Sequence, residues 1–247
     1  AGTSGHLLGG ALAVIVLGPN LGIICISIVV VIQSLLFADG GLSALGINVL
    51  NMAIITSLVG WLTISLWKKL FGEANVSILS GSIVAGVLSV IFSSIAFVFE
   101  YALGGTVSVP LGKVLIAMLS SHLLIGLGEG VITALIVSLL LRVRSDLVYI
   151  KTDENTKNNK STFYGLFLFL LLCLTLVTPY ASSSPDGLES VANDFGFSES
   201  TGIVLLLEDY GISSLNNNFL STTLSAVLGV VVIIGFSNIV LKYRKKI

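Results

Sequence analysis

Charged side chains are scarce in this chain: 12 Lys and Arg and 13 Asp and Glu make up only 10% of its 247 residues. Ordinary globular domains carry about 25% charged residues. Hydrophobic residues account for 55% of the chain, and the mean hydropathy is +1.04. This composition argues against a water-soluble fold and indicates an integral membrane protein with several α-helical spans.

Several chemical signatures are also missing from the sequence. It has no phosphate-binding Gly-Lys-Ser/Thr motif, no HExxH and no GxSxG, which argues against an ATPase or hydrolase site within this chain. Its two cysteines, Cys25 and Cys173, lie inside apolar segments without CxxC spacing and are expected to pack or to face lipid. No internal repeat is present, which weighs against the inverted-repeat transporters.

Long apolar segments are the main feature that is present. A helix needs roughly 20 mostly apolar residues to cross about 30 Å of hydrocarbon. We therefore expect an all-α, polytopic transmembrane bundle of about five hydrophobic segments, followed by a two-helix transmembrane hairpin. The expected spans are 20–37, 46–67, 77–99, 112–141, 162–178 and 222–241, and a shorter apolar piece, 7–17, precedes Gly18 and Pro19.

The basic residues predict the side of the membrane on which each loop lies, because cytoplasmic loops are enriched in Lys and Arg. If three basic segments are inside, only Lys113 of the twelve basic residues falls outside. The acidic segment 180–221 is then extracellular, and the C-terminus is cytoplasmic. The basic segments hold Lys68 and Lys69; Arg142, Arg144, Lys151, Lys157 and Lys160; and Lys242, Arg244, Lys245 and Lys246.

A polar linker, which includes the run KTDENTKNNKS, is the one plausible domain boundary. We expect a membrane bundle over 1–144, a cytoplasmic linker over 145–161 and a hairpin over 162–247. The chain opens on Ala1, within AGTSGHLLGG and without a basic leader, so we expect the natural N-terminus to lie upstream.

His6 is the first candidate for a functional residue. It lies just before an apolar helix on the predicted outer side, after four small residues that allow an irregular turn. Imidazole is a common ligand of nickel, cobalt, copper and zinc. Taken alone, a single His at a helix start more often has a structural role than a metal-binding one.

Asp39, Asn48 and Asn51 lie at the same predicted membrane surface as His6. The two asparagines are three residues apart and are expected to share one face of a helix. They could orient a ligand, or they could cap helices and form interhelical hydrogen bonds.

A polar stripe follows the expected helix 112–141. His122, Gly126, Glu129 and Thr133 recur at spacings of four, three and four, so they share one face, which must point away from lipid because of Glu129. The stripe could belong to a metal route or support a binding site. Alternatively, a His122–Glu129 hydrogen bond and close approach at Gly126 and Gly130 could lock helix packing. A membrane-embedded enzyme or accessory protein that uses His122 and Glu129 as acid and base is a further reading.

Three segments carry a family resemblance. TSGHLLGG at 3–10, LLFADGGLSALGINVLNMA at 35–53 and SSHLLIGLGEGVIT at 120–133 resemble the CbiM/NikM family, the substrate-capture membrane components of energy-coupling-factor importers for cobalt and nickel. SSSPDGLESVANDFGF at 182–197 resembles the PDGLE domain, a CbiN/NikN-like partner that some members carry fused at the C-terminus.

The resemblance implies a multi-pass protein of a prokaryotic cell membrane that binds Ni²⁺ or Co²⁺ as cargo and has no permanent cofactor. It implies a transmembrane coupling subunit and two cytoplasmic ATPase subunits as partners, with no nucleic acid and no enzymatic activity of its own. It makes His6 a metal ligand beside an amino-terminal Met-His segment that this sequence lacks, so the chain as it stands is expected to bind metal weakly. Asp39, Asn48, Asn51, His122 and Glu129 become supporting residues. Nickel and cobalt both remain open as the ion, and so does an ATPase-independent metal channel.

Overall fold

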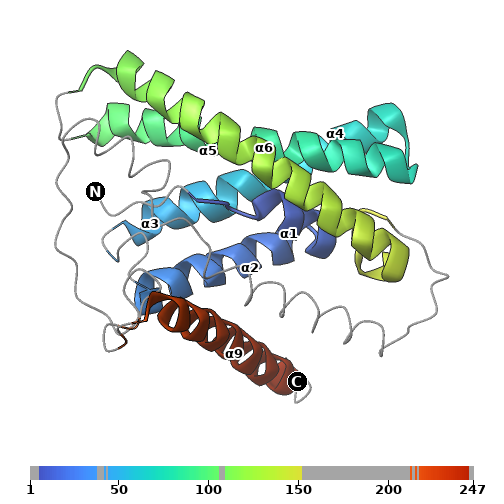
Figure 1. The fold of residues 1–247 in the computed structure, drawn as a ribbon. Coiled ribbons are helices and arrows are strands. Elements are labelled where there is room, and N and C mark those ends of the chain that lie inside the picture. Colours follow the sequence, from blue (N-terminus) through green and yellow to red (C-terminus); the bar gives the residue numbers. More distant parts are fainter. Residues whose placement is uncertain are drawn as a thin grey trace. The chain divides into compact units, whose positions relative to one another are not determined.

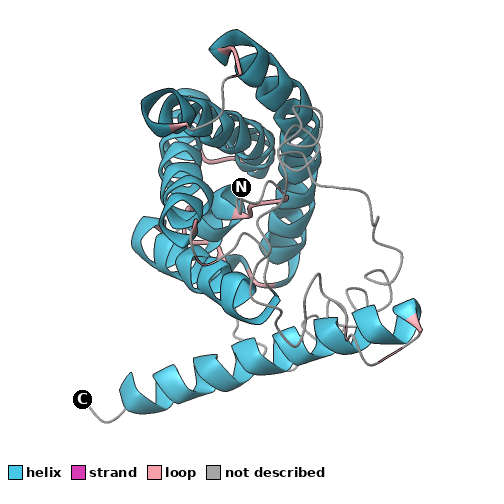
Figure 2. Ribbon diagram, turned by 90° about the vertical axis from the view of Figure 1, so that its left-hand side faces the viewer, coloured by secondary structure: helices cyan, strands magenta, loops and turns pink. Residues whose placement is uncertain are grey.

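The computed structural model describes residues 6–37, 42, 44–105, 109–151, 212, 215 and 217–244. These residues form helices and loops, with no strand among them (Figure 2). The helices in chain order are α1 (Gly10–Leu17), α2 (Pro19–Ile32), η1 (Gln33–Phe37), α3 (Leu45–Asn48), η2 (Val49–Ile55), α4 (Thr56–Phe71), α5 (Asn75–Gly104), α6 (Leu111–Val143), η3 (Ser145–Leu147) and α9 (Asn218–Arg244), as labelled in Figure 1. Of these, η1 and η2 are π-helices and η3 is a 3₁₀-helix.

Four continuous helical segments are long and apolar enough to cross a membrane. They run over Pro19–Phe37, Leu45–Phe71, Asn75–Gly104 and Leu111–Val143, with 19, 27, 30 and 33 residues. At 1.5 Å per residue even the shortest reaches about 28 Å, close to the thickness of the hydrocarbon layer. The expected all-α, polytopic membrane bundle is confirmed. The expected span 162–178 and the acidic segment 180–221 fall wholly or largely outside the described residues.

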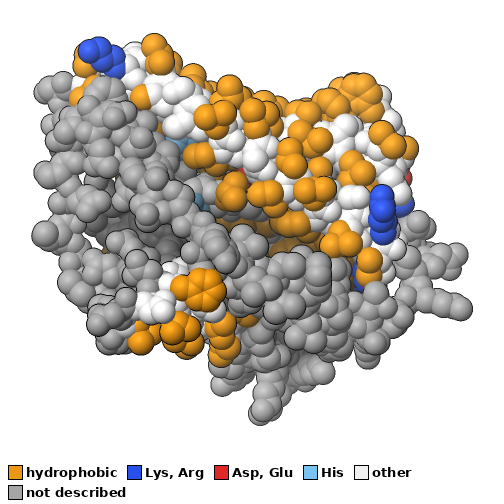
Figure 3. Space-filling view, in the orientation of Figure 1, with side chains coloured by type: hydrophobic (Ala, Val, Ile, Leu, Met, Phe, Trp, Pro, Cys, Tyr) orange, Lys and Arg blue, Asp and Glu red, His pale blue; other side chains and the backbone are white. Residues whose placement is uncertain are grey.

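The outer face of α5 and α6 carries the large apolar side chains expected of a lipid-facing surface. On α6, Ile116 is 71% exposed and Leu124 is 72% exposed. Figure 3 shows hydrophobic side chains across this face, with Lys and Arg side chains toward its two ends. This distribution places the apolar surface within the bilayer and the charged residues at its borders.

The chain divides into two compact units, and α1 to α6 belong mainly to the first. Within that unit, α5 and α6 lie antiparallel and touch backbone to backbone. A Cβ on Gly86 would lie 2.6 Å from the Gly130 Cα, and one on Gly126 would lie 3.1 Å from the Val87 carbonyl oxygen. These distances confirm the close approach predicted at Gly126 and Gly130. Larger residues at these positions would force the two helices apart.

One end of the first unit is closed by the segment that follows α6. Tyr149 and Ile150 donate backbone hydrogen bonds to Val16 (3.2 Å) and Ile15 (3.3 Å) at the end of α1. The Lys68 ammonium donates to the Ile150 carbonyl at 2.8 Å. Because this end collects Lys68, Arg142, Arg144 and Lys151, we call it the basic end.

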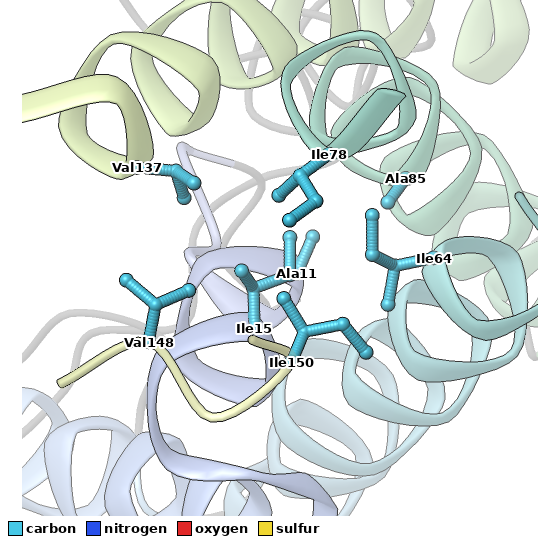
Figure 4. Packing of buried hydrophobic residues seen from close by; sticks show 8 residues of the cluster. All are labelled: Ala11, Ile15, Ile64, Ile78, Ala85, Val137, Val148 and Ile150. Carbon is cyan, nitrogen blue, oxygen red and sulfur yellow. The ribbon is translucent and has the colours of Figure 1, made fainter. Parts of the chain in front are cut away.

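An apolar core supports this closure. Ala11 and Ile15 of α1, Val137 of α6 and Val148 are all completely buried. Figure 4 shows them pointing toward one another together with Ile64, Ile78, Ala85 and Ile150. The core holds the end of α1 in place, so that the residues preceding α1 enter the opposite half of the unit.

The second unit contains α9, whose side chains are described from Phe219 to Val232. Asn217 stands just before the helix, and its side-chain oxygen accepts a hydrogen bond from the Leu220 N–H at 3.2 Å. This is the usual way in which Asn satisfies a free donor in the first helical turn.

Candidate functional site

His6 lies on a non-helical segment that precedes a short helix. α1 has eight residues, about 12 Å of rise, which cannot by itself cross about 30 Å of hydrocarbon. The preceding backbone at residues 6–9 is irregular and ends at Gly9, whose φ of 73° favours glycine. Irregular backbone inside a membrane is tolerated only where its polar groups find partners.

Glu129 supplies those partners. One carboxylate oxygen accepts a hydrogen bond from the Leu8 N–H at 2.7 Å, and the other accepts one from the Gly9 N–H at 3.1 Å. Glu129 is only 3% exposed, and it reaches this segment from the middle of α6. The two contacts therefore anchor the irregular segment, and with it His6, to the longest helix of the unit.

The imidazole of His6 has two defined neighbours. Its Nδ1 lies 2.6 Å from the carbonyl oxygen of Leu7, and its Nε2 lies 3.1 Å from the side-chain nitrogen of Gln33. An amide nitrogen donates and does not accept, so this arrangement assigns the proton to Nδ1 and the lone pair to Nε2. A neutral imidazole binds a metal ion through the nitrogen that carries the lone pair, here Nε2. A hydrogen bond from the other nitrogen, Nδ1, to a carbonyl oxygen usually fixes the tautomer and orientation of such a ligand.

Apolar packing surrounds the segment from several elements. Leu8 lies in a buried cluster with Val30 of α2, Met52 of η2 and Val90 of α5. Val30 of α2 packs on Leu8, and Gln33 of η1, one turn later in the same continuous helical segment, presents its amide to His6. The site is thus assembled from α2, η1, η2, α5 and α6.

The predicted stripe on α6 faces the interior, as its spacing indicated. His122 is 4% exposed, Glu129 3% and Thr133 1%. Nδ1 of His122 lies 2.9 Å from the Met118 carbonyl oxygen. Among the described residues Glu129 is bonded to the backbone of Leu8 and Gly9 and not to His122, so the hydrogen bond considered between these two side chains is not formed.

Asn48 and Asn51 are both buried, with 3% and 6% exposure, near the end of the unit opposite the basic end. The Asn51 side-chain nitrogen donates to Glu100 at 2.8 Å, and Ser93 donates to the Asn51 carbonyl at 3.1 Å. Asn51 lies within a π-helix, which changes the angular spacing that a three-residue separation implied. Asp39 lies outside the described residues.

Two residues of this region were missed by the sequence reasoning. Gln33 is an amide within an apolar segment, and Glu100 is a carboxylate one turn before the end of α5. Gln33 carries a detectable signal, because a polar group inside an expected span is costly and marks a functional position, whereas Glu100 lies one residue beyond the expected span 77–99. In the part of the chain that the structure describes, no three His, Cys, Asp or Glu side chains gather into a metal-ligating group.

The fold and these contacts define a multi-pass helical membrane protein with a partly buried imidazole held on a non-helical segment that α6 anchors. The chain belongs to the CbiM family, described as the cobalt uptake substrate-specific transmembrane region, whose profile matches residues 1–147. The profile of the PDGLE domain matches residues 160–246.

Relatives cover much of the chain. A protein of Archaeoglobus fulgidus named "Putative fused nickel transport protein NikMN" is 30% identical over 250 residues, covering 99% of this chain and 79% of the relative. The fused nickel transport protein NikMN of Rhodobacter capsulatus is 26% identical, covering 95% and 78%. The cobalt transport protein CbiM of Geobacter sulfurreducens is 31% identical, covering 72% and 53%. No solved structure matches the chain.

Proposed function

We propose that this chain is the metal-binding membrane subunit of an ATP-driven energy-coupling-factor importer for nickel or cobalt ions. The observation that carries the proposal is the His6 imidazole, whose Nε2 lies beside the Gln33 amide on a segment anchored by Glu129. Nitrogen ligands suit Ni²⁺ and Co²⁺, and relatives carry names of nickel and cobalt transport proteins.

In this proposal His6 binds the ion through Nε2, and Gln33 is the group that the ion displaces. Glu129 has a second effect besides anchoring the segment, because its carboxylate is bonded to the N–H groups two and three residues after His6 and so lies near the imidazole. A divalent cation bound to His6 therefore places positive charge near the negative carboxylate, and this attraction favours binding in a low-dielectric interior. Asn48 and His122 are buried in the same unit and serve as supporting residues.

The remaining parts of the proposal concern topology and partners. The bundle 1–144 would carry the ion, the linker 145–161 and the C-terminus would lie in the cytoplasm, and the hairpin 162–247 would present the acidic segment 180–221 outside. ATP would be hydrolysed by two separate cytoplasmic subunits acting through a transmembrane coupling subunit, in agreement with the lack of a Gly-Lys-Ser/Thr motif in this sequence.

The direct test replaces His6 in the full-length protein expressed with its partner subunits. His6→Ala removes the proposed ligand atom and is expected to abolish accumulation of radioactive nickel and cobalt in cells. Leu124→Ala, at a position 72% exposed on α6, is a control that should leave accumulation unchanged. Normal accumulation by His6→Ala at native membrane levels would refute the assignment.

The match to a PDGLE domain makes an ATPase-independent channel the second candidate, because capture component and partner lie in one chain. Uptake in cells that lack the ATPase subunits separates the two functions. A coupled importer loses nickel uptake in those cells, whereas a channel still lets nickel enter down its electrochemical gradient.

A further inference from the structure

Two buried oxygen atoms at the junction of η2 and α5 accept no hydrogen bond. They are Oδ1 of Asn51 and Oε1 of Glu100. The two side chains are joined through their other polar atoms, since the Asn51 nitrogen donates to Glu100 Oε2 at 2.8 Å. The pair therefore presents one amide oxygen and one carboxylate oxygen with unused lone pairs.

This arrangement is costly without a further partner. Asn51 is only 6% exposed, and an acceptor that is buried without a hydrogen bond destabilises the fold. A carboxylate that is partly removed from water also needs a compensating positive charge. Among the described residues, Glu100 forms no ion pair with Lys, Arg or His.

The pair lies in the same half of the first unit as His6. Glu100 lies one turn before the end of α5. Gln33, which contacts His6, is the first residue of η1, which ends at Phe37. Met52, the neighbour of Asn51, packs in one cluster with Leu8, two residues from His6. An ion entering from this end would meet both places within the same half of the bundle.

We propose that Asn51 Oδ1 and Glu100 Oε1 form a second, weaker divalent-cation site beside the His6 site. Carboxylate and amide oxygens bind divalent cations, but two such ligands with water completing the shell hold Ni²⁺ or Co²⁺ less tightly than imidazole nitrogen. The site therefore takes up the ion and releases it readily. The identity of the ion rests on the proposed function, whereas the existence of a cation site does not.

The first experiment measures cation binding directly, with Mn²⁺ as the probe because it prefers oxygen ligands and its free form gives an electron paramagnetic resonance signal. Full-length His6→Ala protein in lipid nanodiscs is titrated with Mn²⁺ and compared with the double variant His6→Ala, Glu100→Gln. The glutamine keeps the volume and an acceptor for Asn51 but removes the charge. We expect at least a tenfold loss of affinity for one Mn²⁺ in the double variant.

Two further variants make the result decisive. Glu73→Gln removes a carboxylate that is 68% exposed beside Lys68, and it should leave Mn²⁺ binding unchanged. Glu100→Asp keeps the charge and should keep most of the binding, which shows that loss in Glu100→Gln does not come from misfolding. Equal Mn²⁺ binding with and without the Glu100 carboxylate overturns the proposal, and so does equal loss in Glu100→Asp and Glu100→Gln.

Uptake separates this proposal from the function of the protein. In cells, Glu100→Gln alone should raise the external nickel concentration for half-maximal uptake about tenfold and leave the maximal rate unchanged. If His6→Ala abolishes uptake while Glu100→Gln has no effect on half-saturation, the second site is refuted and the importer stands. If His6→Ala leaves uptake intact, the importer site is refuted, and the Mn²⁺ titration still decides the oxygen site.

Discussion

Replacement of Glu129 by Gln tests how the His6 segment is held. In the native protein each carboxylate oxygen accepts one backbone N–H, from Leu8 at 2.7 Å and from Gly9 at 3.1 Å. Glutamine has the same shape but only one oxygen, so it can satisfy only one of the two donors. The other N–H then faces a side-chain NH₂ group, and both are donors in a buried place.

The size of the effect follows from the lost contact. A hydrogen bond to a charged acceptor contributes about 1.5–3 kcal/mol, and a buried donor left unpaired costs a similar amount, so a loss of about 2–3 kcal/mol of anchoring is expected. If metal binding requires the anchored segment, the apparent affinity falls by the same free energy, or about 30- to 150-fold. The lost negative charge acts in the same direction.

Isothermal titration of the full-length protein in nanodiscs with Ni²⁺ measures this affinity, and Glu73→Gln provides an isosteric control at an exposed carboxylate. Amide hydrogen exchange gives an independent readout, because Leu8 and Gly9 should exchange faster in Glu129→Gln while the amides of α5 stay protected. A nickel affinity within about threefold of native, with the two amides still protected, would show that Glu129 does not anchor the site.

Two other substitutions test packing and ligand chemistry. Gly130→Ala places a Cβ 2.6 Å from the Ile83 carbonyl oxygen and is expected to destabilise the protein by about 1–3 kcal/mol, seen as a lower midpoint of thermal unfolding in detergent, whereas Gly128→Ala, with no atom within 4 Å, should not. Equal midpoints for the two variants would contradict the tight α5–α6 contact. Gln33→Leu removes the donor that occupies His6 Nε2, so Ni²⁺ affinity should rise by up to about fivefold, because a neutral hydrogen bond contributes about 1 kcal/mol. A lower affinity in titration would show instead that the Gln33 amide helps to hold the ion.

Hydropathy alone was sufficient to predict most of the membrane bundle. The expected spans at 46–67, 77–99 and 112–141 each lie inside a continuous helical segment of the structure. The π-helices at Gln33–Phe37 and Val49–Ile55 could not be predicted. Apolar composition does not tell whether a backbone hydrogen bond joins residues five apart, as in a π-helix, or four apart, as in an α-helix. As a result, the relation between Asn48 and Asn51 is not that of two residues on a regular α-helix.

The site could be predicted in part. The spacing of His122, Glu129 and Thr133 was enough to place them toward the interior, because a carboxylate cannot face lipid. The partners of Glu129 could not be inferred, since Leu8 and Gly9 lie more than a hundred residues away and contribute backbone groups, which leave no trace in side-chain patterns. Gln33 could have been found by asking which apolar segments contain an isolated amide.

The glycine contact between α5 and α6 limits where an ion can travel. The backbones of α5 and α6 are in contact where Gly86 packs on Gly130 and where Gly126 packs on Val87. This contact leaves no space for a hydrated ion between the two helices at these positions. If His6 binds the ion as proposed, we expect its inward passage to open along α1, α2 or α4, and these are the helices that a transport cycle would have to displace.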